Sequence, residues 1–424
     1  KENFIKRFKK AENYAPWLES VFLKQLAKED FAFLQEKLHK FQGFNIQKRV
    51  IRNYPIKSAA NILGYINEVN ELVAKKDNYY QQGELIGKAG VEAQYEKVLR
   101  GKKGKKYFRR DRFNKIKGPF KNGIYDSIAV NGKDITLTID SKLQQYGEYL
   151  MKGKRGGIIA LEPSSGEILA LVTSPSYDPN MMVGRLRSPN SVKLIGDSIN
   201  KPMYDRGLKG TYPPGSPFKL VNALIGLQED VIDENTHFFC NGGYRYGNRK
   251  KEFMKCHCDI YGKPIQLNSA ISKSCNSYFA NTYKRIIEKN KNSTNGMNNW
   301  STHVKSFGLG NYLGYDLPEG DKGLIPNGDY YNRMYKHRWN ASTNISNAIG
   351  QGEVLTTPIQ LANVTAAIAN RGFFYTPHVV KKINNQAIID PSYTTPKHTT
   401  IDKNTLSQSS RECTKFLKQV QLVG

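Results

Sequence analysis

The amino-acid sequence predicts an α+β protein in which helices pack on an antiparallel sheet. Strand-like apolar runs at residues 135–139 and 156–174 come before a stretch with mainly helical periodicity. Hydrophobic residues make up 39% of the chain and aromatic residues 11%, values that fit a folded globular protein. At 424 residues the chain is long enough for two or three domains with a sizeable core.

The first 132 residues are rich in charge and mix short elements. A helical run at 15–38 precedes a glycine-punctuated stretch at 83–104. A boundary then follows, where "ITLTI" (135–139) alternates as a strand and Asp140 or Ser141 can cap the helix that begins next. We therefore expect an N-terminal domain over 1–132 and a second domain over 133–424.

The second domain is expected to begin with a hairpin and continue with helices. Two apolar runs within 156–180 flank Pro163 and the turn "SSG", a pattern typical of two strands joined by a short turn. Helical runs follow the segment "PPGSPFK" (213–219), and again over 270–287 and 357–372.

The chain is strongly basic, with a formal net charge of +27 and its densest run at 100–118. Such a charge favours polyanions or anionic lipid, although a basic soluble surface is an equally good interpretation. Because no recognition motif accompanies the charge, nucleic-acid binding is not predicted. No window holds about 18 consecutive apolar residues, so the sequence contains no transmembrane helix. The chain opens in mid-pattern, and we expect that a natural N-terminus has been removed.

Ser216 and Lys219 form an S-x-x-K pattern at a predicted helix start. Pro213 and Pro214 prevent an incoming helix, and Gly215 permits an unusual backbone angle. Ser216 then lies where backbone N–H groups can stabilise an oxyanion, and a partly buried lysine one turn later can accept its proton. The pattern alone is weak, since it recurs at Ser198 and since a serine at a helix start is usually a cap.

A second polar element, "SCN", occupies residues 274–276. The S-x-N pattern occurs at four other places in the chain, so spacing alone carries little information. Ser274 and Asn276 differ from the rest because they stand at the seam between two amphipathic helical runs.

Four cysteines fall within 36 positions. Cys256 and Cys258 cannot easily bridge each other across one residue, and His257 between them is an alternative ligand. The soft donors suffice for tetrahedral zinc, which we favour over a disulfide or free thiols. The candidate ligands are Cys240, Cys256, His257, Cys258 and Cys275. Cys275 is also the middle residue of "SCN", so a metal would pin the turn that carries Ser274 and Asn276.

Taken together, the motifs resemble the class B penicillin-binding proteins of the elongation type over nearly the whole chain. "IGKAGVEAQYEKVLRGKKG" (86–104) is similar to the pedestal-domain signature, and "ITLTIDSKLQQYGE" (135–148) to the entry into the transpeptidase domain. The hairpin at 156–180, "YPPGSPFKLVNAL" (212–224) and "AIGQGEVLTTPIQLANVTAAIANRG" (348–372) resemble its hairpin, nucleophile helix and late helix.

The resemblance implies a fold and an activity. The fold would be a pedestal domain of the dimerisation type followed by a penicillin-binding transpeptidase domain, an antiparallel sheet flanked by helices with a helical subdomain. The activity would be peptidoglycan D,D-transpeptidation through a serine acyl-enzyme, inhibited by β-lactams. Ser216 would be the nucleophile and Lys219 its base. Ser274 would relay a proton to the leaving amine, and Asn276 would hold a substrate carbonyl.

The resemblance also implies partners and a location. The partners would be peptidoglycan stem peptides, β-lactams, a polytopic membrane glycosyltransferase and other proteins of the elongation machinery. A missing N-terminal helix would anchor the chain in the inner membrane, with its domains in the periplasm. Zinc ligands lie behind the S-x-N turn in some members of the family, and the chemistry itself would need no cofactor.

One departure from the family is the absence of a K-[ST]-G triplet from all 424 residues. In the family its strand binds the substrate carboxylate and completes the oxyanion hole. Either the sequence is incomplete after Gly424 or the protein is a catalytically inert scaffold of the same fold. We favour incompleteness, since the Ser216 and Lys219 chemistry would otherwise be retained without purpose.

Overall fold

The computed structural model describes most of the chain and separates it into two compact units. The described residues are 2–14, 22–23, 26, 28–41, 43–44, 46, 51–81, 84–112, 116–289, 292–387, 390–402 and 405. Unit 1 comprises residues 1–135, 176–203 and 383–385, and unit 2 comprises 136–175, 204–382 and 386–424. The predicted helical run at 15–38 lies partly outside the described residues.

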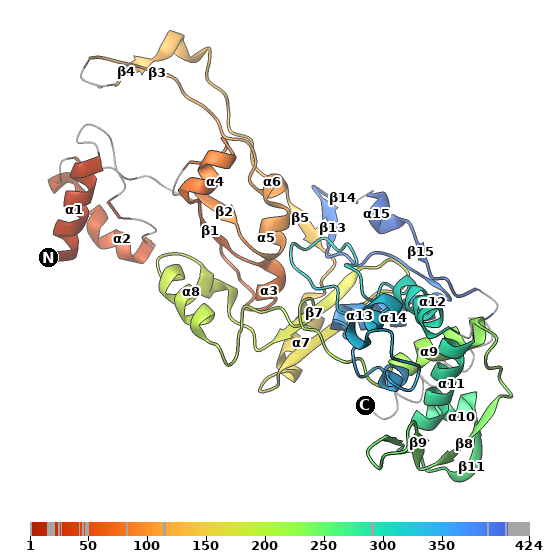
Figure 1. Cartoon of the computed structure of the whole chain (residues 1–424). Helices are drawn as coiled ribbons and strands as arrows, with labels where there is room; N and C mark the ends of the chain where they lie inside the picture. Colours follow the sequence, from red (N-terminus) through yellow and green to blue (C-terminus); the bar gives the residue numbers. More distant parts are fainter. Residues whose placement is uncertain are drawn as a thin grey trace. The chain divides into compact units, whose positions relative to one another are not determined.

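Unit 1 is built from short elements (Figure 1). Its buried core is small and contains residues such as Ile62, Val69 and Val91. Strands β1 and β2 pair antiparallel, and α5 packs against α3 and β2. Its elements, apart from the β3–β4 ribbon, are α1 (Glu2–Tyr14), α2 (Lys28–Gln35), η1 (Leu38–Lys40), α3 (Ala60–Leu63), β1 (Ile66–Glu68), α4 (Glu71–Lys76), β2 (Leu85–Gly87), α5 (Gly90–Gln94), α6 (Glu96–Leu99), η3 (Pro179–Met182) and α8 (Arg187–Gly196). No helix among the described residues is long and apolar enough to cross a membrane.

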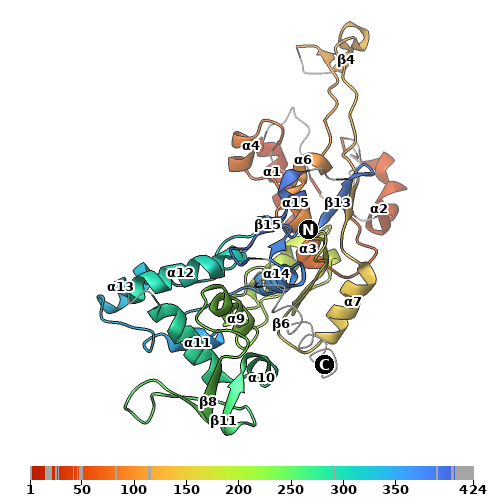
Figure 2. The same cartoon turned by 90° about the vertical axis from the view of Figure 1, so that its right-hand side faces the viewer.

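A narrow two-stranded ribbon of unit 1 follows α6 in the chain and ends before β5. It carries β3 (Phe108–Arg110), β4 (Ile116–Pro119) and η2 (Phe120–Gly123). Isolated bridges between Lys102 and Val130 and between Lys105 and Ser127 continue the antiparallel pairing toward its base. Figures 1 and 2 show it extending beyond α4 and α6.

Unit 2 contains the predicted hairpin with helices on its strands. Strands β6 (Gly156–Leu161) and β7 (Ile168–Ser174) pair antiparallel around the turn at Pro163–Gly166, as the sequence predicts. Helix α7 (Ser141–Leu150) packs on β7, and its N-cap is Asp140, whose carboxylate accepts hydrogen bonds from two backbone N–H groups. Helix α14 (Pro358–Ala369) packs on β6. These contacts confirm the α+β class.

The helical part of unit 2 surrounds α11 (Asn276–Glu288). This helix packs against α9 (Phe218–Gln228), α12 (Ser293–Ser306) and η4 (Ile345–Ile349), and it is buried on most sides. The largest fully buried side chains of this region are Phe218, Tyr278, Phe279, Tyr283, Trp300, Phe307 and Tyr331. The core around α11 therefore fixes the two helix starts that carry the predicted catalytic residues.

A small β excursion covers one end of α11. Strands β8 and β11 pair with each other, as do β9 and β10, and Figure 1 shows them together with α10 below α11. Their bounds are β8 (His237–Asn241), β9 (Gly243–Arg245), β10 (Phe253–Lys255), β11 (Tyr261–Gln266) and α10 (Leu267–Ser272). The remaining elements are β5 (Ile135–Leu137), α13 (Gly328–Tyr335), β12 (Phe373–Phe374), β13 (Val380–Ile383), β14 (Gln386–Ala387), α15 (Pro391–Thr394) and β15 (Lys397–His398). The order β14-β13-β5 forms a three-stranded sheet.

Candidate active site

Ser216 stands just before helix α9, as the sequence predicts. Pro217 is the N-cap and the helix proper begins at Phe218. Gly215 has a φ of +66°, in the left-handed region that favours glycine. Its N–H donates a 2.9 Å hydrogen bond to the carbonyl of Gly350, which fixes the approach to the helix. The serine side chain itself is exposed, so a substrate can reach its hydroxyl.

The "GQG" turn at 350–352 supports this helix start. Gly350 also has a positive φ, and a Cβ placed on it would lie 2.5 Å from the Gly215 carbonyl oxygen and 2.6 Å from the Phe218 Cβ. Since real Cβ atoms do not approach other atoms so closely, only glycine permits this packing. The turn therefore positions the residue that precedes Ser216.

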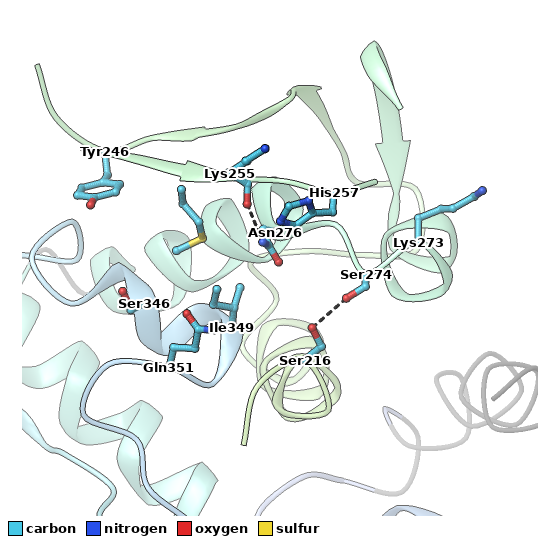
Figure 3. Close-up of a pocket in the computed structure, with 11 residues that line it drawn as sticks. Ser216, Tyr246, Lys255, His257, Lys273, Ser274, Asn276, Ser346, Ile349 and Gln351 are labelled. Atoms are coloured by element: carbon cyan, nitrogen blue, oxygen red, sulfur yellow. Dashed lines mark hydrogen bonds between the residues drawn. The ribbon is translucent and has the colours of Figure 1, made fainter. Parts of the chain in front are cut away.

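Ser274 reaches Ser216 from the seam between α10 and α11. Its hydroxyl donates to the Ser216 Oγ over 3.0 Å, although the two residues are 58 positions apart (Figure 3). The seam is held by backbone hydrogen bonds from Ser274 to Ile271 and from Cys275 to Ala270. Ser274 has a φ of +51°, a strained angle for a residue with a Cβ, and such strain persists only where the surroundings impose it.

Lys219 is buried, with 3% of its surface exposed, and its ammonium nitrogen is enclosed by polar atoms. The Nζ donates to the Ser274 Oγ at 2.9 Å, to the Ser274 carbonyl at 2.8 Å and to the Asn276 Oδ1 at 2.6 Å. The hydrogen-bonded path from Lys219 to Ser216 therefore passes through the Ser274 hydroxyl. The sequence placed the lysine next to Ser216 but did not indicate this intermediate.

Burial changes the acid–base behaviour of Lys219. Removal of its ammonium group from water lowers the pKa to about 8 from an ordinary 10.5, and the nearby cysteines oppose this shift. A larger fraction of the amine is then neutral near neutral pH than for a surface lysine. A neutral amine next to the Ser274 hydroxyl can accept a proton, which is the property a general base requires.

Asn276 is held on both sides. Its Oδ1 accepts from Lys219, and its Nδ2 donates to the carbonyl of Lys255 over 2.8 Å. The backbone N–H of Asn276 also donates to the Cys256 Sγ at 3.2 Å. The end of β10 and the cysteine that follows therefore fix the orientation of this amide.

Ser216, Ser274 and Asn276 line a pocket of about 620 Å³ (Figure 3). The hydroxyls of Ser216 and Ser274 point toward each other, and Lys273 points away from Ser216. The pocket is lined by Ser216, Tyr246, Met254, Lys255, His257, Lys273, Ser274, Asn276, Ser346, Ile349 and Gln351. The sequence did not indicate Tyr246, Met254 or Ser346, because they reach the site only through the fold of the β excursion and η4.

The four clustered cysteines converge behind the S-x-N turn. Cys240, Cys256, Cys258 and Cys275 are free thiols whose Sγ atoms all lie within 4.8 Å of one another. Three of the four are buried, within an apolar cluster. The sequence left His257 and Cys258 open as the fourth ligand. In the structure Cys258 joins the other sulfurs, whereas His257 lines the pocket instead.

The sulfur geometry fits a tetrahedral metal site. The Sγ–Sγ separations include 3.2 Å for Cys256–Cys258, 3.5 Å for Cys240–Cys258 and 3.7 Å for Cys258–Cys275. Four thiolates about 2.3 Å from a zinc ion stand roughly 3.8 Å apart. The hydrogen bond with Cys275 lowers the pKa of the Cys256 thiol, which favours its thiolate. Burial raises the pKa of Cys240, and the hydrogen bond with Cys256 raises that of Cys275, so these two thiols favour the protonated form when no metal is bound.

Two protein-family models match the chain. The "Penicillin binding protein transpeptidase domain" matches residues 156–424, and the "Penicillin-binding Protein dimerisation domain" matches residues 1–137. Peptidoglycan D,D-transpeptidase MrdA of Acinetobacter baumannii is 34% identical over 381 residues, which are 89% of this chain and 54% of that protein. The chain thus spans about half the length of the curated relatives it matches.

Solved structures agree with these matches. PBP2 of Pseudomonas aeruginosa, solved in complex with WCK 5153, is 30% identical with a TM-score of 0.68; the match covers 87% of this chain and 75% of that one. PBP2 of Helicobacter pylori in its complex with MreC gives a TM-score of 0.77 at 24% identity, covering 97% of this chain and 76% of that one. At 24% identity, the similarity to the H. pylori structure supports the fold alone.

Proposed function

The chain belongs to the class B penicillin-binding proteins, and we propose that it acts as a peptidoglycan D,D-transpeptidase through an acyl-enzyme on Ser216. The observation that carries the proposal is the hydrogen-bonded series Ser216–Ser274–Lys219, which ends in a buried amine of lowered pKa. An exposed nucleophile and a relay line one pocket, and the buried base is hydrogen-bonded to the relay behind them. Acyl transfer requires this set.

In the acylation step, the Ser216 Oγ attacks the carbonyl carbon of the penultimate D-Ala of a stem peptide. Its proton passes to Ser274, whose own hydroxyl proton passes to the neutral Lys219 amine. The C–N bond then breaks, and the same path returns one proton to the nitrogen of the leaving D-Ala. The amine of a neighbouring stem peptide attacks the ester and releases Ser216, with the proton moving in the reverse direction.

Asn276 would orient the Lys219 amine and the bound peptide. Its Nδ2 is bonded to the Lys255 carbonyl and its Oδ1 to Lys219, so the amide holds the lysine amine beside Ser274. Its position on the pocket wall also suits it to hold a carbonyl of the bound peptide. β-Lactams mimic the peptide carbonyl, so they should acylate Ser216 and leave it slowly.

Fluorescent penicillin tests the proposal directly. The wild-type chain should become covalently labelled, and Ser216→Ala should remove the label while circular dichroism stays unchanged. Ser198→Ala is the matched control, since Ser198 begins the other S-x-x-K pattern, and it should be labelled like wild type. Absence of labelling in the wild-type protein expressed from its whole gene would favour the inert scaffold.

We further propose that the four cysteines hold a structural zinc ion. The support is the set of four sulfurs within 4.8 Å and the N–H of Asn276 directed at the Cys256 Sγ. When bound, the ion would supply folding free energy and a fixed turn at Ser274 and Asn276, with no part in the chemistry. Elemental analysis of protein never exposed to chelator should give about one zinc per chain. A stoichiometry near zero, with few titratable thiols, would favour disulfides.

Membership of the family supports a proposal about location and partners. We propose that the chain works at the periplasmic face of the inner membrane, held by an anchor helix, within the elongation machinery. The H. pylori PBP2 is solved with MreC, and a protein of that kind is our candidate partner for unit 1. Co-purification of the full chain with its own MreC-like protein tests this, and a failure to co-purify would speak against it.

A further inference from the structure

The ribbon of residues 102–130 in unit 1, here called the arm, has no core of its own. Among its described residues only Asp111, Gly118 and Gly123 are even partly buried. An isolated two-stranded hairpin is only marginally stable in water. The arm therefore contributes no packed face to the rest of unit 1. Packing within the protein does not explain which side chains the arm carries.

The arm exposes bulky apolar side chains that a solvated ribbon does not need. Ile124 is 79% exposed and Ile128 is 92% exposed. Others of the same kind stand along both strands: Tyr107, Phe108, Ile116, Phe120, Tyr125 and Val130. Scattered exposed apolar residues are normal, but eight within one ribbon of under thirty residues mark a contact surface.

The same ribbon carries a concentrated positive charge. Residues 102–130 contain ten lysines and arginines against two aspartates, a formal charge of +8. Both aspartates are engaged within the arm: Asp111 pairs with Lys117 at 3.3 Å, and Asp126 accepts from the backbone N–H of Tyr107. Lys103 pairs with Glu84 outside the arm. The arm still carries a net positive charge, which favours an anionic partner.

Basic and apolar groups lie next to each other along the arm. The Lys121 Nζ stands 5.8 Å from the Phe120 ring centroid and 5.6 Å from that of Tyr125. Aromatic rings beside lysines suit a membrane–water interface, where the rings enter the headgroup layer and the lysine stems reach phosphates. A fluid anionic surface accepts such dispersed side chains without a matching shape, which a folded partner would have to supply.

We propose that the arm is an interfacial contact that binds the headgroups of anionic phospholipids. Its lysines and arginines would pair with lipid phosphates, and the exposed isoleucines and aromatic rings would enter the boundary with the acyl chains. This contact is separate from the pocket at Ser216 and does not depend on acyl transfer.

Vesicle sedimentation with the full chain tests the proposal. The chain should bind vesicles of phosphatidylcholine with phosphatidylglycerol, bind pure phosphatidylcholine far less, and lose binding as salt rises. The double variant Lys105→Glu with Lys106→Glu should weaken partition by about tenfold or more, since each basic residue near the surface contributes about 1 kcal/mol. Ile124→Ser with Ile128→Ser should weaken it at constant charge.

The control has the same net charge as the lysine variant. Lys142→Glu with Lys152→Glu alters two exposed lysines of α7 and its end, in unit 2, and should bind nearly as wild type does. Circular dichroism should be unchanged for every variant, because the altered side chains are exposed. Equal binding to both vesicle types, no binding at low salt, or equal losses in the arm and control variants would overturn the proposal.

Discussion

Two S-x-x-K patterns in the chain show how differently one motif can be used. Ser216 and Lys219 lie at the start of α9, where the lysine is buried and bonded to Ser274 and Asn276. Ser198 and Lys201 lie in a turn of unit 1, and both are exposed. There Lys201 has a φ of +44° and its N–H donates to the Asp197 carbonyl.

The two lysines differ in burial, and burial changes the pKa of the lysine amine. A lysine in water remains charged at neutral pH and cannot take a proton, whereas removal from water lowers the pKa of Lys219 to about 8. The helix start and the apolar core around α11 place that lysine, and they are absent from the turn at 198–201.

The largest effect is expected when the base is removed. Lys219→Ala should slow acylation by penicillin by about three orders of magnitude, because an un-ionised serine is a poor nucleophile. Lys201→Ala is the matched control and should leave the rate unchanged. Stopped-flow measurement of acylation checks both, and a Lys219→Ala rate within tenfold of wild type would remove this lysine as the base.

The relay should matter next. Ser274→Ala should lower the acylation rate by about two orders of magnitude, since the path from Ser216 to Lys219 passes through its hydroxyl. Ser274→Gly distinguishes the loss of the hydroxyl from the effect of backbone strain at this position, because glycine tolerates the φ of +51°. It should be as slow as the alanine variant yet more stable, and a fast glycine variant would refute the relay.

The acylation rate should depend on pH through Lys219. Below pH 8 the ammonium form predominates, so the rate should fall about tenfold for each pH unit, and above pH 8 it should level off. The free energy of unfolding should also rise with pH. Between about pH 8 and 10.5 the folded protein binds fewer protons than the unfolded chain, so burial of the lysine costs less as pH rises there. A flat rate profile from pH 6 to 9 would contradict this assignment.

The smallest effect concerns the sulfur cluster behind the turn. Cys256→Ser should lower the zinc content, reduce the melting temperature by at least about 5 °C and slow acylation severalfold, because Asn276 loses its contact with a ligand. His257→Ala is the control, since His257 lies outside the group of sulfurs, and it should keep both metal and melting temperature. The reverse pattern would make His257 the ligand.

Much of the local structure was predictable because neighbouring residues determine it. The Asp140 cap, the hairpin at 156–174, the positive φ of Gly215 and the seam before Asn276 follow from side-chain chemistry within a few positions. The S-x-x-K spacing placed Ser216 and Lys219 on one face for the same reason.

The remaining features depend on contacts between distant segments. The link from Lys219 to Ser274 joins residues 55 positions apart, and no periodicity encodes it. The position of the Cys258 sulfur beside the other three, with His257 in the pocket lining, depends on how β8 to β11 fold back. In the same way, residues 176–203 follow the hairpin in sequence but belong to unit 1 through contacts made elsewhere.

The central claim is that Ser216, and not the serine of the second pattern, is the nucleophile. Peptide mapping by mass spectrometry after incubation with penicillin tests it most directly. The account predicts one acyl adduct per chain, on the peptide that contains Ser216, and an unmodified peptide around Ser198. An adduct on Ser198 or on any other residue, or an unmodified Ser216 in folded protein, would contradict it.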